Sequence, residues 1–235
     1  MNPVPGGAGP PGATTAAALV RVGTLPAQVD PTTCAIAALA AVAARAGAAP
    51  TYLGATRGSQ VRAQQRLHAV AARTGVPWPE SLGTAPWALA RLAHAATGEA
   101  WCVLPWGRGA RAAVLEANDR GRDAFVYVGG GPNALPAALV GAAGPLAPLL
   151  RRLGDVVPRH VVAVLATPAP TPGVDMDEGV RARVLEVFEP SSGTRTRLSA
   201  DTLDGAAPLP GAPFGNWPRP LIAVVPRAPG ARRRP

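Results

Sequence analysis

The order of helix-like and strand-like segments constrains the fold of this chain more than any other feature. Ala-rich segments with helical periodicity come first, and short Val-rich runs bounded by Pro and Gly follow them. The expected helices cover residues 33–46, 59–74, 84–97 and 137–153 (the last broken near residues 144–145), and the expected strands cover 125–128, 160–165, 183–188 and 221–225. Because the two kinds of element are segregated and do not alternate, the pattern predicts an α+β fold in which helices pack on an antiparallel sheet.

The helical first half has recognisable boundaries. Gly98 follows the expected helix 84–97, whose first turn tolerates Pro86. In the helix 59–74, Ser59 is a possible N-cap. The apolar residues of that helix lie roughly on one face, namely Val61, Leu67, Val70 and Ala71. We expect residues 51–100 to form a helical insert that is either part of the core or a substrate-binding element.

The length and apolar content favour one main domain. The chain has 235 residues, of which 48% are hydrophobic, enough for a substantial core. We expect this domain to cover residues 16–226, between a flexible Pro/Gly-rich arm at residues 1–15 and a basic tail at residues 227–235.

The net charge of +9 comes from arginine alone, because all 23 cationic residues are Arg. A GC-rich genome accounts for this bias. Nucleic acid is not expected as a partner, since the arginines are scattered and no aromatic residues alternate with them for base stacking. The Ala-rich stretch after Thr32 breaks at Arg45 and Gly47, so no membrane span is expected, and residues 1–12 lack a secretory signal. A cytoplasmic location is the default expectation.

The cysteines limit the chemistry that the chain can carry. Cys34 and Cys102 are too few for a disulfide framework, and they lack metal-ligand spacing. We therefore expect neither a metal nor a cofactor.

The segment 28–34 (QVDPTTC) runs directly into an Ala-rich helix and points to nucleophilic chemistry. A thiol at a helix N-terminus lies beside unsatisfied N–H groups and the positive end of the helix dipole, both of which favour the thiolate. Thr32 or Thr33 would cap the helix, and Pro31 would hold the approach extended. The Gln28 amide and the backbone N–H of Cys34 would serve as two donors to an oxyanion. Burial in the core remains the ordinary alternative for such a cysteine.

A nucleophilic cysteine needs a base, and the chain offers His68, His94 and His160. The first two lie inside expected helices, whereas His160 opens a Val-rich strand, from which its ring can project at a sheet edge. Glu189 closes the next strand. Antiparallel pairing of these two strands would place Glu189 beside His160 as the group that orients the imidazole. A surface histidine and a solvated carboxylate are the alternatives.

The order Gln, Cys, His at a strand start, then an acidic residue before Pro-x-x-Gly resembles the papain-like cysteine peptidases. The resemblance is greatest to the bacterial branch of bacteriocin-processing double-glycine peptidases. It implies Gln28 for the oxyanion hole, Cys34 as nucleophile, His160 as general base and Glu189 as orienter. Papain itself uses Asn followed by Trp as orienter, so Asn216, which precedes Trp217, is the second candidate.

Some positions depart from the family pattern. Asp often precedes the nucleophile and Gly often follows it, where this chain has Thr33 and Ala35, and the third member is Glu instead of Asp. The leading prediction is a cysteine peptidase-like hydrolase or acyl transferase that cleaves a peptide or amide bond of a peptide or protein substrate. A catalytically inactive papain-like module that binds a protein partner is the alternative, and an Arg-rich nucleic-acid binder is the weakest hypothesis.

Overall fold

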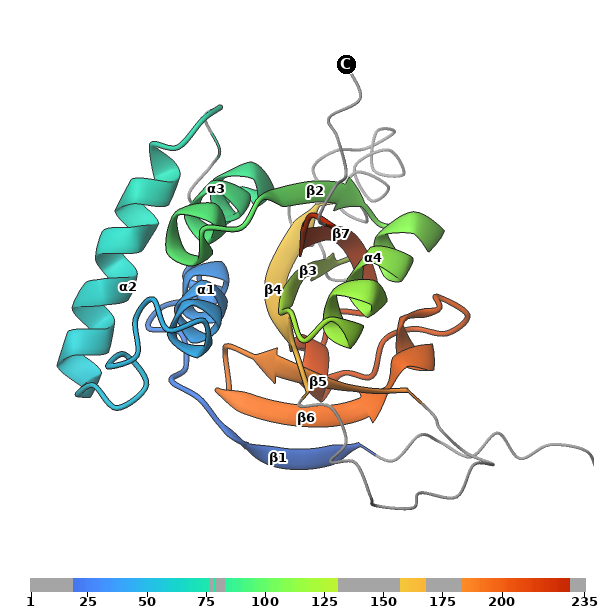
Figure 1. The fold of residues 1–235 in the computed structure, drawn as a ribbon. Coiled ribbons are helices and arrows are strands. Elements are labelled where there is room, and N and C mark those ends of the chain that lie inside the picture. Colours follow the sequence, from blue (N-terminus) through green and yellow to red (C-terminus); the bar gives the residue numbers. More distant parts are fainter. Residues whose placement is uncertain (1–18, 77, 79–82, 131–156, 168–182, 229–235) are drawn as a thin grey trace, which may run out of the picture.

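A computed structural model of the chain describes residues 19–76, 78, 83–130, 157–167 and 183–228 (Figure 1). The expected helix at 137–153, the N-terminal arm and most of the basic tail lie outside the described residues.

The centre of the fold is a seven-stranded, fully antiparallel sheet with the strand order β1-β6-β5-β4-β3-β7-β2. Its strands are β1 (Val20–Thr24), β2 (Trp101–Pro105), β3 (Ala124–Gly129), β4 (Pro158–Leu165), β5 (Val184–Glu189), β6 (Thr194–Ser199) and β7 (Arg219–Pro226). The central strands β3 and β4 are buried on both faces, which explains their continuous apolar sequences. The expected α+β class with an antiparallel sheet is therefore confirmed.

Helices cover both faces of this sheet (Figure 1). They are α1 (Cys34–Arg45), α2 (Arg57–Ala72), α3 (Pro86–Thr97) and α4 (Arg108–Asp119). On one face, α1 and α3 pack against alternate strand side chains such as Phe125, Val161 and Phe188. On the other face, α4 packs against the intervening side chains, among them Val126 and Val162.

Helix α1 lies on the sheet beside α3, and α2 packs on their outer side (Figure 1). Its residues from Cys34 to Ala44 are all buried, as expected for a helix that is apolar all round. Ile36 packs against α2 and α3, while Ala40 packs against Tyr52 in the loop before α2. The helices of residues 51–100 thus contribute to the core that holds α1 in place.

Two details of α2 differ from the prediction. Its N-cap is Thr56, whose hydroxyl accepts a hydrogen bond from the Ser59 N–H, so Ser59 is not the cap. The buried face carries Gln60, Gln64 and Ala71, whereas Val70 is 50% exposed. The predicted apolar face is therefore rotated around the helix axis relative to the face that is buried. The difference arises because two glutamines, Gln60 and Gln64, occupy interior positions.

The segregation of helices and strands is also less strict than expected. Strand β1 precedes α1, and β2 and α4 lie between α3 and β3. Strand β6 was missed because its sequence, TRTRLS, alternates short polar and charged residues and lacks a valine run. The predicted α+β class still holds, because the strands that the sequence did not indicate, β1, β2 and β6, also pair antiparallel.

Within the described residues, no helix combines the length and apolarity that crossing a bilayer would require.

Candidate active site

Cys34 is the first residue of α1 and is 4% exposed. The two threonines before it do not act as expected. Thr33 occupies the N-cap position without a side-chain cap, since its hydroxyl accepts from the Val29 and Asp30 N–H groups and donates to the Asp30 carbonyl. The Thr32 hydroxyl donates to Asp30 Oδ1 over 2.7 Å. No threonine side chain therefore caps α1 beside the Cys34 thiol.

The chain enters α1 through a tight turn, not through an extended segment. The Thr33 N–H donates to the Asp30 carbonyl over 3.2 Å, which closes a turn around Pro31. Asp30 Oδ1 accepts from the Thr32 N–H over 2.8 Å and stabilises this turn. The expected extended approach is thus corrected: Pro31 presets the turn that delivers Cys34 to the start of α1.

Cys34, His160 and Glu189 lie together in a row, in which His160 is hydrogen-bonded to Glu189. His160 Nε2 lies 2.7 Å from Glu189 Oε1, and Cys34 is close enough to the imidazole to help raise its pKa. Since Nε2 faces the carboxylate, Nδ1 is left for the thiol. The row can transfer a proton between sulfur and imidazole while the carboxylate fixes the ring.

The sheet supplies the two partners of Cys34 from neighbouring strands. His160 lies near the start of β4, level with Val128 of β3. Glu189 ends β5, one residue after Phe188, which pairs with Ala163 of β4. The antiparallel pairing on which the sequence argument depended is present, and it brings the carboxylate to the imidazole.

A turn of the chain holds the Glu189 carboxylate from its other side. Oε1 accepts hydrogen bonds from the Ser191 N–H and hydroxyl, at 2.8 and 2.6 Å, and Oε2 accepts one from the Ser192 N–H at 2.9 Å. Burial raises the pKa of Glu189, but the hydrogen bonds from His160, Ser191 and Ser192 outweigh it and lower the pKa from 4.5 to about 2. Glu189 is therefore an anion throughout the neutral range.

Burial and polar interactions also oppose each other in setting the pKa of His160, but here the net shift is upward. Burial alone would lower the pKa of the imidazole, but hydrogen bonds to Cys34 and Glu189 and the negative charges of both raise it from 6.5 to about 9. A protonated His160 at neutral pH is the partner that a Cys34 thiolate needs.

Gly215 covers the imidazole ring and was not identified from the sequence. It follows the short 3-10 helix Ala212–Phe214 and adopts a left-handed backbone with φ of 62°. A Cβ atom at this position would lie 2.7 Å from His160 Cδ2 and 2.9 Å from Nε2. Only a residue without a side chain fits so close to the ring, which restricts the imidazole to one plane.

Asn216, the second candidate for the orienter, points elsewhere. Its Oδ1 lies against Gly211, where an added Cβ would be 2.7 Å away, and its N–H donates to the Gly211 carbonyl. The acceptor of His160 Nε2 is Glu189.

Gln28 lies in the loop before α1, as the oxyanion argument requires. Its Nε2 donates to the Asp30 carbonyl over 3.0 Å, which uses one of the two amide hydrogens. Its Oε1 is buried, with no hydrogen-bond partner in the part of the chain that the structure describes. The reverse amide orientation would set Oε1 against the Asp30 carbonyl oxygen, so the nitrogen is correctly placed toward it. The second N–H of Gln28 has no acceptor among the described residues and can donate to a bound ligand.

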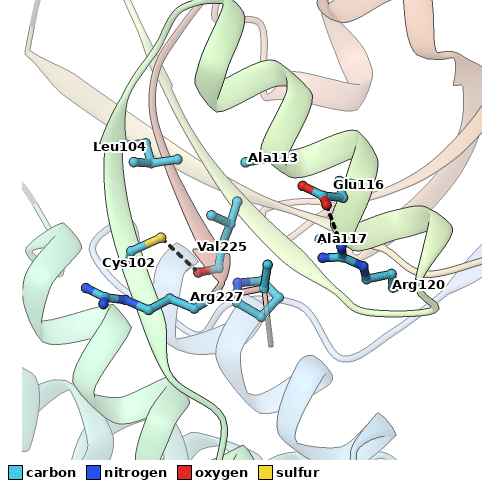
Figure 2. Close-up of a pocket in the computed structure, with 10 residues that line it drawn as sticks. Cys102, Leu104, Ala113, Glu116, Ala117, Arg120, Val225 and Arg227 are labelled. Atoms are coloured by element: carbon cyan, nitrogen blue, oxygen red, sulfur yellow. Dashed lines mark hydrogen bonds and ion pairs between the residues drawn. The ribbon is translucent and has the colours of Figure 1, made fainter. Parts of the chain in front are cut away.

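Cys102, the second cysteine, lies on β2 in a surface pocket of about 320 Å³ beside β7 and α4 (Figure 2). Its thiol contacts the Val225 carbonyl oxygen at 3.6 Å, and no histidine lines the pocket. Burial raises the pKa of the Cys102 thiol despite the nearby charge of Arg227. Both observations leave Cys34 as the nucleophile candidate.

His68 and His94 are not partners of Cys34. His94 Nδ1 lies 2.7 Å from the Glu99 carbonyl oxygen at the end of α3, and His68 lies on α2. Across the described ranges, no cluster of His, Cys, Asp and Glu could hold a metal ion.

No family model matches the chain, and no curated protein matches it. The case for a function therefore rests on the residues themselves.

Proposed function

We propose that this chain is a cysteine peptidase-like hydrolase or acyl transferase of papain-like architecture, acting on a peptide or amide bond. Cys34 would be the nucleophile, His160 the general base and acid, Glu189 the residue that orients the imidazole, and Gln28 a donor to the oxyanion. One observation carries the proposal: the buried His160–Glu189 pair, 2.7 Å apart at Nε2 and Oε1, lies beside Cys34, and the pKa of its imidazole is raised to about 9.

Acylation begins when Cys34 Sγ, as a thiolate paired with the His160 imidazolium, attacks the carbonyl carbon and forms a C–S bond. The carbonyl oxygen takes the negative charge and receives hydrogen bonds from the Gln28 amide and the Cys34 N–H. Collapse of this intermediate breaks the C–N bond, and the His160 imidazolium gives its proton to the leaving amine. The result is a thioester on Cys34 and a neutral His160.

Deacylation uses the neutral imidazole as a base. His160 takes a proton from water while the water oxygen adds to the thioester carbon, and the C–S bond breaks to release the carboxylic acid and the Cys34 thiolate. An amine acceptor in place of water would give acyl transfer by the same steps. Glu189 stays an anion throughout and holds His160 Nε2, because its oxygens also accept from Ser191 and Ser192.

The test compares the wild-type chain with Cys34→Ala and the matched control Cys102→Ala. The probes are p-nitrophenyl acetate and a panel of peptidyl aminomethylcoumarins, with iodoacetamide to identify the reactive thiol by peptide mass. We expect turnover and alkylation to be lost in Cys34→Ala and retained in Cys102→Ala, with far-UV circular dichroism unchanged in both. Unchanged turnover in Cys34→Ala would end the proposal. Alkylation of wild-type Cys34 no faster than that of N-acetylcysteine, without turnover, would favour the non-catalytic binding module.

A further inference from the structure

We propose that Gln64, a buried glutamine of α2, is a positioning residue that fixes the loop carrying Gln28 so that its amide faces the oxyanion. The proposal rests on the function proposed above. It also assigns a role to the helical insert of residues 51–100, from which Gln64 and Arg57 bind the loop of Gln28.

Gln64 binds the peptide groups on both sides of Gln28. Its Oε1 accepts from the Val29 N–H over 3.1 Å, and its Nε2 donates to the Ala27 carbonyl over 3.0 Å. The second hydrogen of Nε2 goes to the Tyr52 hydroxyl over 2.8 Å. The side chain is fully buried, at 0% exposure, and each of its polar atoms has a partner. A completely satisfied buried amide fixes its neighbours in one arrangement.

The remaining backbone groups of Gln28 are held as well. Its N–H donates to the Pro190 carbonyl over 2.8 Å, and its carbonyl accepts from Arg57 over 3.0 Å. With the flanking peptides bound to Gln64, only the side-chain torsions of Gln28 remain free, and the Asp30 carbonyl restricts these. The amide is thereby preorganised before an oxyanion forms, which is the condition for strong electrostatic stabilisation.

Gln64 itself cannot touch a substrate, because no part of its side chain is exposed. It must act through Gln28 if it acts on the reaction at all. Its effect should therefore appear in reactions that develop an oxyanion, and should be absent from reactions of the same thiol that do not.

Two reagents for Cys34 make this distinction. Acylation by p-nitrophenyl acetate passes through a tetrahedral oxyanion, whereas alkylation by iodoacetamide is a direct displacement at carbon without one. The main variant is Gln64→Met, which keeps the length of the side chain and removes its hydrogen bonds. The fold should tolerate it, because Ala27 keeps its bond from Arg57 and Val29 keeps its bond to Thr33.

Gln60→Met is the matched control. Gln60 is a buried glutamine one turn earlier on α2, and its Nε2 donates only to the carbonyls of Tyr52 and Ala55. Tyr52→Phe is a milder second variant, which removes a single acceptor from Gln64.

We expect Gln28→Ala to slow acylation by about 100-fold and Gln64→Met by about 10-fold, in line with the loss and the misplacement of one oxyanion donor. In the Gln28→Ala background, Gln64→Met should cost less than about twofold, since residues that act as one unit are not additive. Alkylation should change by less than about twofold in every variant, and acylation of Gln60→Met should stay near the wild-type rate. Tyr52→Phe should also slow acylation without slowing alkylation, but by a smaller factor than Gln64→Met.

If wild-type Cys34 is acylated and the Gln64→Met variant is acylated at the same rate, the positioning role alone is overturned. The same holds if the rate losses of Gln28→Ala and Gln64→Met multiply in the double variant. Equal slowing of acylation and alkylation would overturn it as well, because it would show general damage to α1. A wild-type chain that p-nitrophenyl acetate does not acylate at Cys34 would overturn the proposed function and the positioning role together.

Discussion

Replacing Glu189 with Gln tests the electrostatics of the site most directly. The substitution keeps the shape and one acceptor oxygen but removes the charge that faces His160 Nε2. The pKa of His160 is raised from 6.5 to about 9, a preference for the imidazolium of about 3 kcal/mol against the effect of burial. A charge-assisted hydrogen bond is roughly twice as strong as a neutral one, so the His160 titration should move about 1 to 2 pH units toward neutral.

Histidine NMR measures the midpoint of the His160 titration without a substrate. The three imidazoles are followed by proton–carbon correlation spectra from pH 5 to 11, and the His160 signal is assigned by its loss in His160→Gln. Amide turnover should show the same change in its basic limb, because the leaving amine takes its proton from the imidazolium. At pH 8.5 the protonated fraction would fall from roughly three quarters to about one tenth if the midpoint moved by about 1.5 pH units.

Glu186→Gln is the matched control. Glu186 lies three residues earlier in the same strand, is buried, and pairs with Arg195 and Arg197 instead of His160. Its substitution should leave the His160 midpoint in place. A wild-type midpoint near 6.5, or one that Glu189→Gln does not lower, would refute the electrostatic reasoning.

Two further predictions concern the surroundings of the row. Gly215→Ala should displace the imidazole and slow acylation by at least about tenfold, because the added Cβ would lie 2.7 Å from His160 Cδ2. Gly205→Ala carries similar backbone strain, at φ of 80°, with no atom within 4 Å of the added Cβ, and should be as active as wild type in the same assay. Because the pKa of Glu189 is lowered from 4.5 to about 2, its contribution to stability is present above pH 4.5 and is lost as the pH falls through 2. Urea unfolding should show the difference between wild type and Glu189→Gln shrinking by up to about 3 kcal/mol between pH 6 and pH 2, and a constant difference would contradict the shift.

The strand that carries His160 could be predicted from the sequence because its burial on both faces demands a continuous apolar run. The strand that ends at Glu189 could be predicted from its Val, Leu and Phe residues even though Glu186 interrupts them, and antiparallel pairing with β4 then brings the ends of the two strands together. Strand order could not be predicted, since β7 inserts between β3 and β2 through backbone bonds that no side-chain pattern encodes.

Other parts of the site depend on groups that leave no periodic signal. The N–H groups of Ser191 and Ser192 bind Glu189 through the backbone, and Gly215 acts through the absence of a side chain. The role of Gln64 could not be predicted from the sequence for a different reason. A glutamine within a helix is ordinarily solvated, and only its tertiary neighbours show that it faces inward. The weak apolar face of α2 was the available signal: a helix with few apolar residues that is nevertheless packed must bury some polar ones.

One turn, residues 189–193, links the proposed base, His160, to the proposed oxyanion donor, Gln28. It begins with Glu189, which holds His160, while its Pro190 carbonyl accepts from the Gln28 N–H. Its end is bound to the same loop, since the Gly193 carbonyl accepts from the Leu25 N–H. A Cβ at Gly193 would lie 2.6 Å from the Leu25 carbonyl oxygen, so the two segments are as close as backbones allow. The imidazole and the Gln28 amide are therefore not placed independently around Cys34. A displacement of this turn would move both, and the proposed reaction would lose proton transfer and oxyanion binding together.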